Sequence, residues 1–274
     1  MSKAEDEALE CRLVLEAIHA KYGYDFREYA EPTIRRRLQA ALAKSGLPHL
    51  GALQHELLVD GAFFRWLLDG LTVHVSEMFR DPPFFDAFRQ QVVPLLRTYP
   101  VVKIWHAGCA GGEEVYTIAI LLIEEGLYER TQLYATDISP GAIERAKEGI
   151  YDEAEVTAFT QNYRSAGGKF ELSEYYTAAY GKIALREAVR KNIVFFEHDL
   201  TSDHALGEMH VILCRNVLLY FGNRLRSRVL DMFTGALARR GFLCLGLNES
   251  LPETHALRFE ELVPSRIFRR VEGA

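Results

Sequence analysis

The stretch between residues 101 and 123 limits the possible folds more than any other part of the chain. Residues 101–106 are rich in β-forming side chains, residues 108–112 contain three glycines, and a helical pattern follows. Apolar residues recur there with the spacing of one helix face, at Val115, Ile118, Ala119, Leu122 and Ile123. A strand, a glycine-rich turn and a helix in succession predict a doubly wound α/β sheet, with the turn at its ligand-binding edge.

The same turn limits the kind of ligand. Glycines let the main chain approach a bound molecule, and free N–H groups at a helix N-terminus suit a nucleotide-like ligand. However, Glu113 and Glu114 open the helix, and their carboxylates would repel a pyrophosphate. The stretch also lacks a G-x-G-x-x-G fingerprint, which disfavours a dinucleotide-dependent oxidoreductase. We therefore expect a ligand with hydroxyls or positive charge, such as S-adenosylmethionine.

Composition narrows the class of protein. A chain of 274 residues with 49% hydrophobic side chains can bury the cores of two domains. Its net charge of −6 does not indicate a broad nucleic-acid-binding surface. No apolar run is long enough to span a membrane and the acidic N-terminus lacks a signal-peptide pattern, so we expect a cytoplasmic protein. The cysteines form no C-x-x-C pair and the histidines no clear ligand cluster, so we expect reduced thiols and no metal site.

The first 75 residues predict helices separated by proline and glycine. The helix predicted over residues 33–44 has an apolar face and places Arg35, Arg36 and Arg37 on the opposite side. In an acidic protein this basic face is either a docking surface for an anionic partner or a solvated surface, and charge alone leaves both open. Further along, Asp81 precedes two prolines and an apolar run, which predicts a helix N-cap.

From residue 76 onward the pattern alternates between strands and helices. Strands are predicted over residues 132–138, 193–200, 210–214 and 242–246, with a further edge strand over 266–271. Residues 151–191 break the alternation and predict a small inserted antiparallel sheet. We thus expect a helical domain over residues 1–75 and an α/β domain over residues 76–274.

Residues that suit ligand binding occur where the predicted strands end. They are Glu113 beside the glycine turn, then Asp137, then Asp199 and Leu200, then Arg215, Asn216 and Tyr220. Because ligands of open α/β sheets bind at the carboxyl ends of the strands, we expect these residues to surround one crevice. An acid at the end of the second strand can bind ribose hydroxyls, which is the role we expect for Asp137.

Five segments together resemble the chemotaxis receptor methyltransferase family, the CheR proteins. The segments are 76–80, 110–119, 135–138, 198–200 and 214–221, and the resemblance covers nearly the whole chain. It implies an S-adenosylmethionine-dependent, Rossmann-like α/β methyltransferase domain with a small inserted antiparallel β-subdomain, preceded by an all-α domain. Enzymes of this family methylate glutamate side chains on the cytoplasmic helices of chemoreceptors, giving glutamyl methyl esters.

The resemblance also implies roles for individual residues. It makes Arg80 and Tyr220 catalytic, with Tyr220 beside the transferred methyl group. The cofactor contacts that it implies are His74, Ser76, Arg80, Glu113, Asp137, Asp199, Leu200, Arg215 and Asn216. His74 departs from the family, which usually has an asparagine there. Because a receptor methylation helix is acidic, the resemblance favours a docking role for Arg35, Arg36 and Arg37.

The chemistry requires little of the protein beyond alignment. A glutamate carboxylate is already a nucleophile at neutral pH, so transfer from a sulfonium needs no general base. Arg80 or Arg97 could hold the substrate carboxylate by two parallel hydrogen bonds. Two alternatives stay open: a catalytically inactive S-adenosylmethionine-binding regulatory module, with His74 as a mark of decay, and a methyltransferase for a receptor of a surface-sensing pathway.

Overall fold

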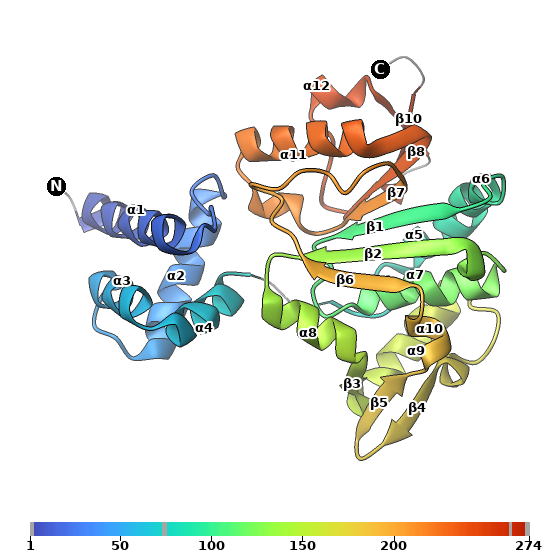
Figure 1. Cartoon of the computed structure of the whole chain (residues 1–274), viewed down its shortest axis with the longest axis horizontal. Coiled ribbons are helices and arrows are strands. Elements are labelled where there is room, and N and C mark those ends of the chain that lie inside the picture. The colour runs from blue at the N-terminus through green and yellow to red at the C-terminus, as the bar shows by residue number, and fades with distance from the viewer. Residues whose placement is uncertain (1–2, 73–75, 263–264, 272–274) are drawn as a thin grey trace.

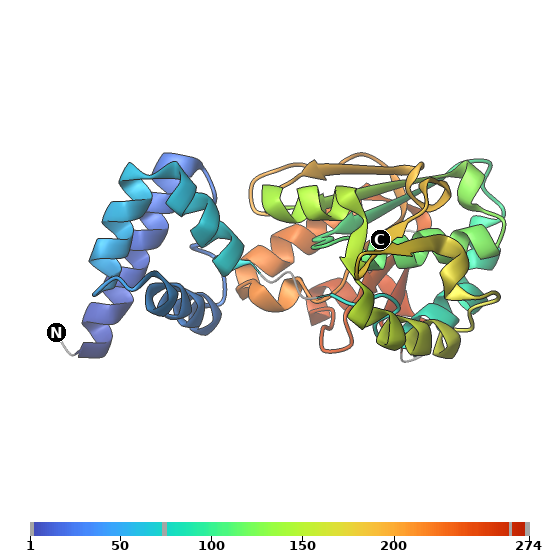
Figure 2. The same ribbon diagram turned by 90° about the horizontal axis from the view of Figure 1, so that it is seen from below.

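The computed structural model describes residues 3–72, 76–262 and 265–271. A helical domain lies beside one end of the sheet of a larger α/β domain (Figures 1 and 2). A small antiparallel sheet extends from the α/β domain on the opposite side from the C-terminal helices (Figure 1). The predicted fold class is therefore confirmed. No helix within these residues is long and apolar enough to cross a membrane.

The helical domain consists of four helices around one apolar core. They are α1 (Lys3–Tyr22), α2 (Glu31–Ser45), α3 (Leu50–Val59) and α4 (Gly61–Leu71). Gly46 ends α2 because it takes a left-handed φ of 71°, which glycine adopts without steric cost. The side chain of Asp60 caps α4 by accepting the N–H of Ala62 at 2.7 Å. Each helix buries leucines in the shared core, so the four helices pack as one unit.

The α/β domain is built on a seven-stranded sheet. In spatial order the strands are β6 (Ile193–Glu197), β2 (Thr131–Asp137), β1 (Val102–Ala107), β7 (Met209–Cys214), β8 (Leu237–Leu245), β10 (Ile267–Arg270) and β9 (Phe259–Glu261). The first five are parallel, and β10 is antiparallel to both of its neighbours. The strand predicted over residues 266–271 is present as β10, but its predicted edge position is wrong, because β9 pairs with the outer side of β10. Both Ile267 and Phe268 are accordingly buried.

Helices cover both faces of this sheet. They are α5 (Pro82–Ala87), α6 (Val93–Leu96), α7 (Glu113–Glu124), α8 (Pro140–Glu148), α11 (Asn223–Ala236) and α12 (Glu253–Ala256), with the short helices η1 (Phe88–Val92), η2 (Tyr128–Arg130) and η5 (Leu218–Tyr220). Along β1, Val102 and Ile104 belong to one apolar core, whereas Trp105 and Ala107 belong to the other. This alternation follows from the two-residue period of a strand and explains why β1 is buried on both sides.

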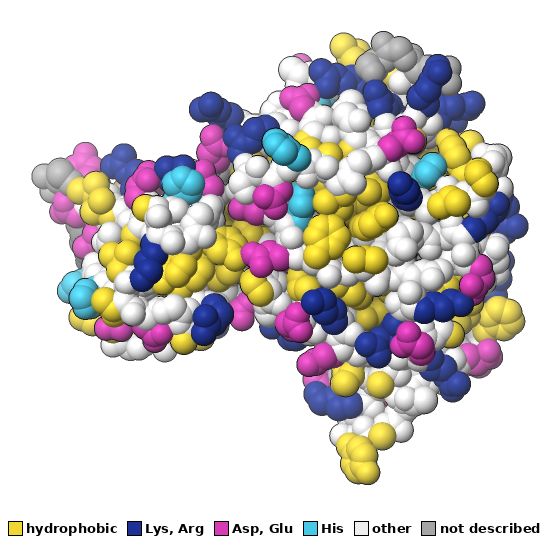
Figure 3. Space-filling view, in the orientation of Figure 1, with side chains coloured by type: hydrophobic (Ala, Val, Ile, Leu, Met, Phe, Trp, Pro, Cys, Tyr) yellow, Lys and Arg dark blue, Asp and Glu magenta, His cyan; other side chains and the backbone are white. Residues whose placement is uncertain are grey.

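The inserted β-subdomain is a three-stranded antiparallel sheet in the order β3–β5–β4. Its elements are β3 (Ile150–Asp152), η3 (Glu153–Glu155), α9 (Val156–Ser165), η4 (Leu172–Tyr175), β4 (Tyr176–Ala179), β5 (Lys182–Leu185) and α10 (Glu187–Arg190). The turn between β4 and β5 leaves the side chain of Tyr180 fully exposed. Figure 3 shows a hydrophobic side chain at the end of this projecting hairpin.

Main-chain hydrogen bonds join the two domains. The segment before α2 runs beside the loop after β7, where Tyr29 forms an antiparallel bridge with Phe221. The N–H of Ala30 donates to Tyr220 O at 2.9 Å, and the N–H of Gly222 donates to Glu28 O at 2.8 Å. The start of α2 is therefore held next to the carboxyl ends of the parallel strands.

Gly222 leaves no room for a side chain at this junction. A Cβ at residue 222 would lie 2.8 Å from Glu28 O, whereas a Cβ at the exposed Gly235 of α11 would meet nothing within 4 Å. We expect Gly222→Ala to lower the free energy of unfolding by about 1–3 kcal/mol through overpacking. The control Gly235→Ala should raise it by about 0.5–1 kcal/mol through helix propensity. Urea unfolding measures both, and an unchanged stability of Gly222→Ala would contradict the close approach.

Candidate functional site

A cavity of about 540 Å³ lies at the carboxyl ends of β1, β2, β6 and β7, and α2 contributes to its wall. Eight of the predicted catalytic and cofactor-binding residues line it: Ser76, Arg80, Asp137, Asp199, Leu200, Arg215, Asn216 and Tyr220. Glu113 does not line it, and His74 lies outside the described residues. The convergence follows from topology, since parallel strands end at the same edge of the sheet.

The glycine turn is shaped by close packing against β2 and the loop after β7. The N–H groups of Gly108 and Cys109 both donate to Thr136 O at 2.8 Å. Gly108 has a φ of 85°, and a Cβ there would lie 2.5 Å from Val217 Cγ2. Only glycine satisfies both the backbone conformation and the approach of Val217. The turn thereby exposes its main chain to the cavity.

Asp137 is held at the end of β2 by two main-chain donors. Its Oδ2 accepts the N–H of Ala110 at 2.9 Å, and its Oδ1 accepts the N–H of Ser139 at 3.0 Å. Ser139 in turn caps α8 by accepting the N–H of Ala142. Each carboxylate oxygen retains a further lone pair for a ligand. Asp137 is therefore a pre-oriented acceptor for hydroxyl groups.

Of the two acids that open α7, Glu114 faces the cavity and Glu113 does not. Successive helix residues point about 100° apart, so only one of the pair can face a given side. Burial raises the pKa of Glu113 to about 7, and its Oε2 has no hydrogen-bond partner among the described residues. Burial also opposes ionisation of Glu114, but Arg215 and His106 hold the pKa of Glu114 below its ordinary value. We therefore propose that Glu114, rather than Glu113, is the acid of α7 that faces the bound ligand.

Arg215 is fixed by two carboxylates. Its Nη1 lies 2.7 Å from Glu114 Oε2, and its Nη2 lies 2.7 Å from Asp81 Oδ2. The guanidinium also stacks on Phe84, 4.0 Å from the ring centroid. The predicted N-cap at Asp81 is wrong in its chemistry: α5 does begin at Pro82, but the Asp81 side chain makes no cap hydrogen bond. The ion pair with Arg215 takes its place, and sequence reasoning contains no signal for this distant partner.

Arg80 presents a free cation to the cavity. Its side chain is exposed, and no residue of the described part of the chain pairs with it. Arg97, the other candidate for holding a substrate carboxylate, pairs with Glu125 at 2.9 Å and does not line the cavity. The geometry favours Arg80 for that role.

The three consecutive arginines of α2 do not share one surface, so the predicted common basic face is wrong for Arg37. Arg37 lines the cavity, with its guanidinium 4.7 Å from the ring centroid of Tyr220, and it donates to Leu71 O. Arg35 pairs with Glu31 at 3.1 Å, and Arg36 is exposed. Three successive residues cover about 200° of a helix, which separates the outer two.

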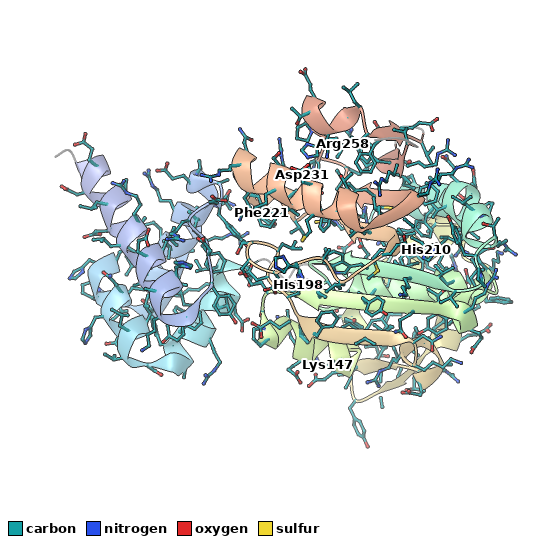
Figure 4. All side chains as sticks on the ribbon, turned by 45° about the horizontal axis from the view of Figure 1, so that its top comes forward. Lys147, His198, His210, Phe221, Asp231 and Arg258 are labelled. Carbon is teal, nitrogen blue, oxygen red and sulfur yellow. The ribbon has the colours of Figure 1, made fainter. Side chains whose placement is uncertain are left out.

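At the end of β6, two buried acceptors lack partners. Asp199 Oδ1 accepts the N–H of Thr201 at 2.8 Å, whereas its Oδ2 has no partner among the described residues; burial raises the pKa of this carboxyl. His198 also lines the cavity; its Nε2 lies 2.9 Å from His204 O, and its buried Nδ1 is likewise unpartnered. Figure 4 shows His198 and Phe221 at the end of the sheet nearest the helical domain. A ligand with an amino group would satisfy such acceptors.

Comparison with known proteins identifies both domains. The family model for the CheR methyltransferase SAM binding domain matches residues 74–266, and the model for the CheR methyltransferase all-alpha domain matches residues 9–72. Cher3 of Pseudomonas putida, whose name carries only a provisional assignment as a methyltransferase, is 48% identical over 98% of this chain and 100% of its own length.

Two more distant relatives are named chemotaxis protein methyltransferase. The protein from Listeria monocytogenes is 27% identical and aligns over 84% of this chain and 85% of its own length. The protein from Pseudomonas aeruginosa is 28% identical over 80% of this chain and 81% of its own length. The alignments therefore extend over both domains.

The residues of the cavity fit S-adenosylmethionine, the ligand of the matched domain. We propose that the free lone pairs of Asp137 accept the ribose hydroxyls. The unpartnered Asp199 Oδ2 and His198 Nδ1 match the hydrogens of the adenine amino group. The carboxylate of Glu114 adds negative charge that suits a sulfonium. Within the described residues, no group of three or more His, Cys, Asp or Glu side chains could hold a metal ion.

Replacing Asp137 should weaken cofactor binding. We expect Asp137→Ala to reduce the affinity for S-adenosylhomocysteine by about 2 kcal/mol, because it removes charge-assisted hydrogen bonds to the ribose. Asp137→Asn keeps the side-chain volume and separates loss of charge from loss of packing. Titration calorimetry measures both variants, and wild-type affinity in both would exclude the ribose role.

Glu113 should make the stability of the fold pH-dependent. Its pKa is about 7 in the folded chain, against 4.5 for the unperturbed group, so between these values the folded state keeps a proton that the unfolded state has lost. Stability therefore falls as pH rises through this window, by roughly 2–3 kcal/mol. Glu113→Gln, which stays neutral, should lose less stability between pH 4 and pH 8 than the wild type. Urea unfolding at several pH values tests this, and parallel pH curves for the two proteins would refute it.

Proposed function

Because the chain belongs to the CheR methyltransferase family, we propose that it methylates glutamate side chains on the cytoplasmic helices of a chemoreceptor, forming glutamyl methyl esters. The observation that carries this proposal is the meeting of two arginines at one cavity. Arg37 comes from the helical domain and Arg80 from the α/β domain; both line the cavity, and Arg37 lies against Tyr220. A cavity with these cations at its wall suits an anionic substrate group.

Substrate alignment is the main task of the residues in this site. When bound, S-adenosylmethionine supplies a methyl group that its sulfonium centre activates. Arg80 is free to hold the incoming carboxylate, whereas Arg215 is occupied by Asp81 and Glu114 and acts as part of the wall. Tyr220, which stacks with Arg37, lies where the two domains meet and limits the approach of the carboxylate. No general base is needed, since a glutamate is ionised at neutral pH.

Only some of the arginines of α2 are available for docking. Arg36 is exposed and available to an acidic receptor helix, and Arg35 is already paired with Glu31. Arg37 reaches the cavity itself, so we assign it to the glutamate that reacts rather than to the surrounding helix. This assignment separates docking from orientation. A cytoplasmic location is part of the same proposal, because the receptor helices that would be methylated lie in the cytoplasm.

The decisive experiment is transfer of a labelled methyl group from S-adenosylmethionine to cytoplasmic receptor fragments. We expect label on glutamates, released by mild alkali as methanol, and we expect Arg37→Ala to reduce kcat/KM for the receptor about tenfold or more through loss of a charge-assisted contact. Affinity for S-adenosylhomocysteine should stay unchanged. Arg36→Ala is the matched control, with a smaller effect that high salt removes, because it is an exposed charge.

The other outcomes are equally informative. Cofactor binding without methylation of any receptor fragment would favour a regulatory module that has lost catalysis. Methylation confined to receptors of a surface-sensing pathway would change the partner and keep the chemistry. Equal kcat/KM for Arg37→Ala and the wild type would remove Arg37 from the reacting site.

A further inference from the structure

The loop after β7 carries two residues of the proposed site, Asn216 and Tyr220. Asn216 has a φ of 61°, in the left-handed region, which asparagine adopts more readily than most other non-glycine residues. Four residues later Tyr220 ends the short helix η5. Both residues line the cavity. The shape of the cavity therefore depends on what supports this loop.

Glu249, which follows β8, provides that support. It is 5% exposed, and its carboxylate accepts three main-chain N–H groups. Oε2 accepts from Asn216 at 2.8 Å and from Gly246 at 2.6 Å, while Oε1 accepts from Leu219 at 3.1 Å. No ion pair with Glu249 occurs in the described part of the chain, so these N–H groups are what offset its buried charge.

Close packing around Glu249 restricts the movement of the turn that carries it. The N–H of Glu249 donates to Gly246 O at 2.9 Å, which folds the segment into a turn beneath the loop. A Cβ at Gly246 would lie 2.8 Å from the main-chain nitrogen of Asn216 and 2.8 Å from Glu249 Oε2. The ends of the adjacent strands β7 and β8 are thus locked together through one side chain.

We propose that Glu249 is a positioning residue for methyl transfer, with a separate task for each carboxylate oxygen. Oε2 holds Asn216, a proposed cofactor contact, and Oε1 holds the Leu219–Tyr220 turn at the reacting centre. The inference rests on the proposed function for the role of Tyr220. The role of Asn216 depends only on cofactor binding.

Glu249→Gln separates the two tasks. The single amide oxygen is best used where two donors converge, at Asn216 and Gly246, so the NH₂ group then faces the N–H of Leu219. We expect the affinity for S-adenosylhomocysteine to stay within about twofold, because the bonds to Asn216 and Gly246 persist. Displacement of Tyr220 should lower kcat for receptor methylation about a hundredfold. Glu249→Ala removes both supports and should also weaken S-adenosylhomocysteine binding about tenfold.

Glu124→Gln is the matched control for loss of a buried carboxylate. Glu124 lies in α7, its side chain is fully buried, it pairs with Arg89, and it does not line the cavity. This variant should lower the melting temperature without changing kcat or the affinity for S-adenosylhomocysteine. Such a result shows that destabilisation alone does not reproduce the kinetic effect.

Two results would overturn the proposal. Wild-type kcat in Glu249→Gln would remove the role of Oε1, and unchanged S-adenosylhomocysteine affinity in Glu249→Ala would remove the role of Oε2. If the wild type methylates no receptor fragment, the proposed function fails by itself. Calorimetry on Glu249→Ala still decides whether the carboxylate holds Asn216.

Discussion

The buried ion pairs of Arg215 are the interaction on which the site most depends. One guanidinium joins the segment before α5, the first turn of α7 and the loop after β7, through Asp81 and Glu114. The Arg215 guanidinium is buried, and taking such a charge out of water costs several kcal/mol, so it must keep its partners. The ion pair also explains why the Asp81 carboxylate makes no cap hydrogen bond to α5. Arg215 consequently links three segments of the chain beside the cavity.

Residues of the helical domain form another part of the cavity wall. The N–H of Ala30 donates to Tyr220 O, and the N–H of Gly222 donates to Glu28 O. These hydrogen bonds hold the start of α2 against the loop that carries Tyr220. The Arg37 guanidinium, from the same helix, stacks on the ring of Tyr220. A carboxylate held between Arg37 and Arg80 would bridge the two domains. In the proposed function, α2 therefore carries both Arg36, which docks the partner, and Arg37, which orients the reacting group.

Much of the fold could be predicted because it follows from short-range sequence patterns. The period of the apolar residues separates the helices of the N-terminal domain from the strands of the sheet, and the glycine turn marks where the first parallel strand ends. The rule that ligands bind at these ends then places Asp137 and Asp199 at one cavity. The edge position of residues 266–271 was wrong because strand order depends on pairing with residues 259–261, which show little pattern of their own.

The sequence by itself determined the secondary structure, the class of fold and the polar residues at the strand ends, because each of these depends on neighbours within a few positions. Only the tertiary structure decided which member of an adjacent pair or triple faces the cavity, as for Glu113 against Glu114 and for Arg37 within its arginine run. It also decided the partners of Asp81 and Glu249, which lie 134 and 33 residues from the groups that they bind. Such pairings follow from the packing of whole elements, and no local pattern encodes them.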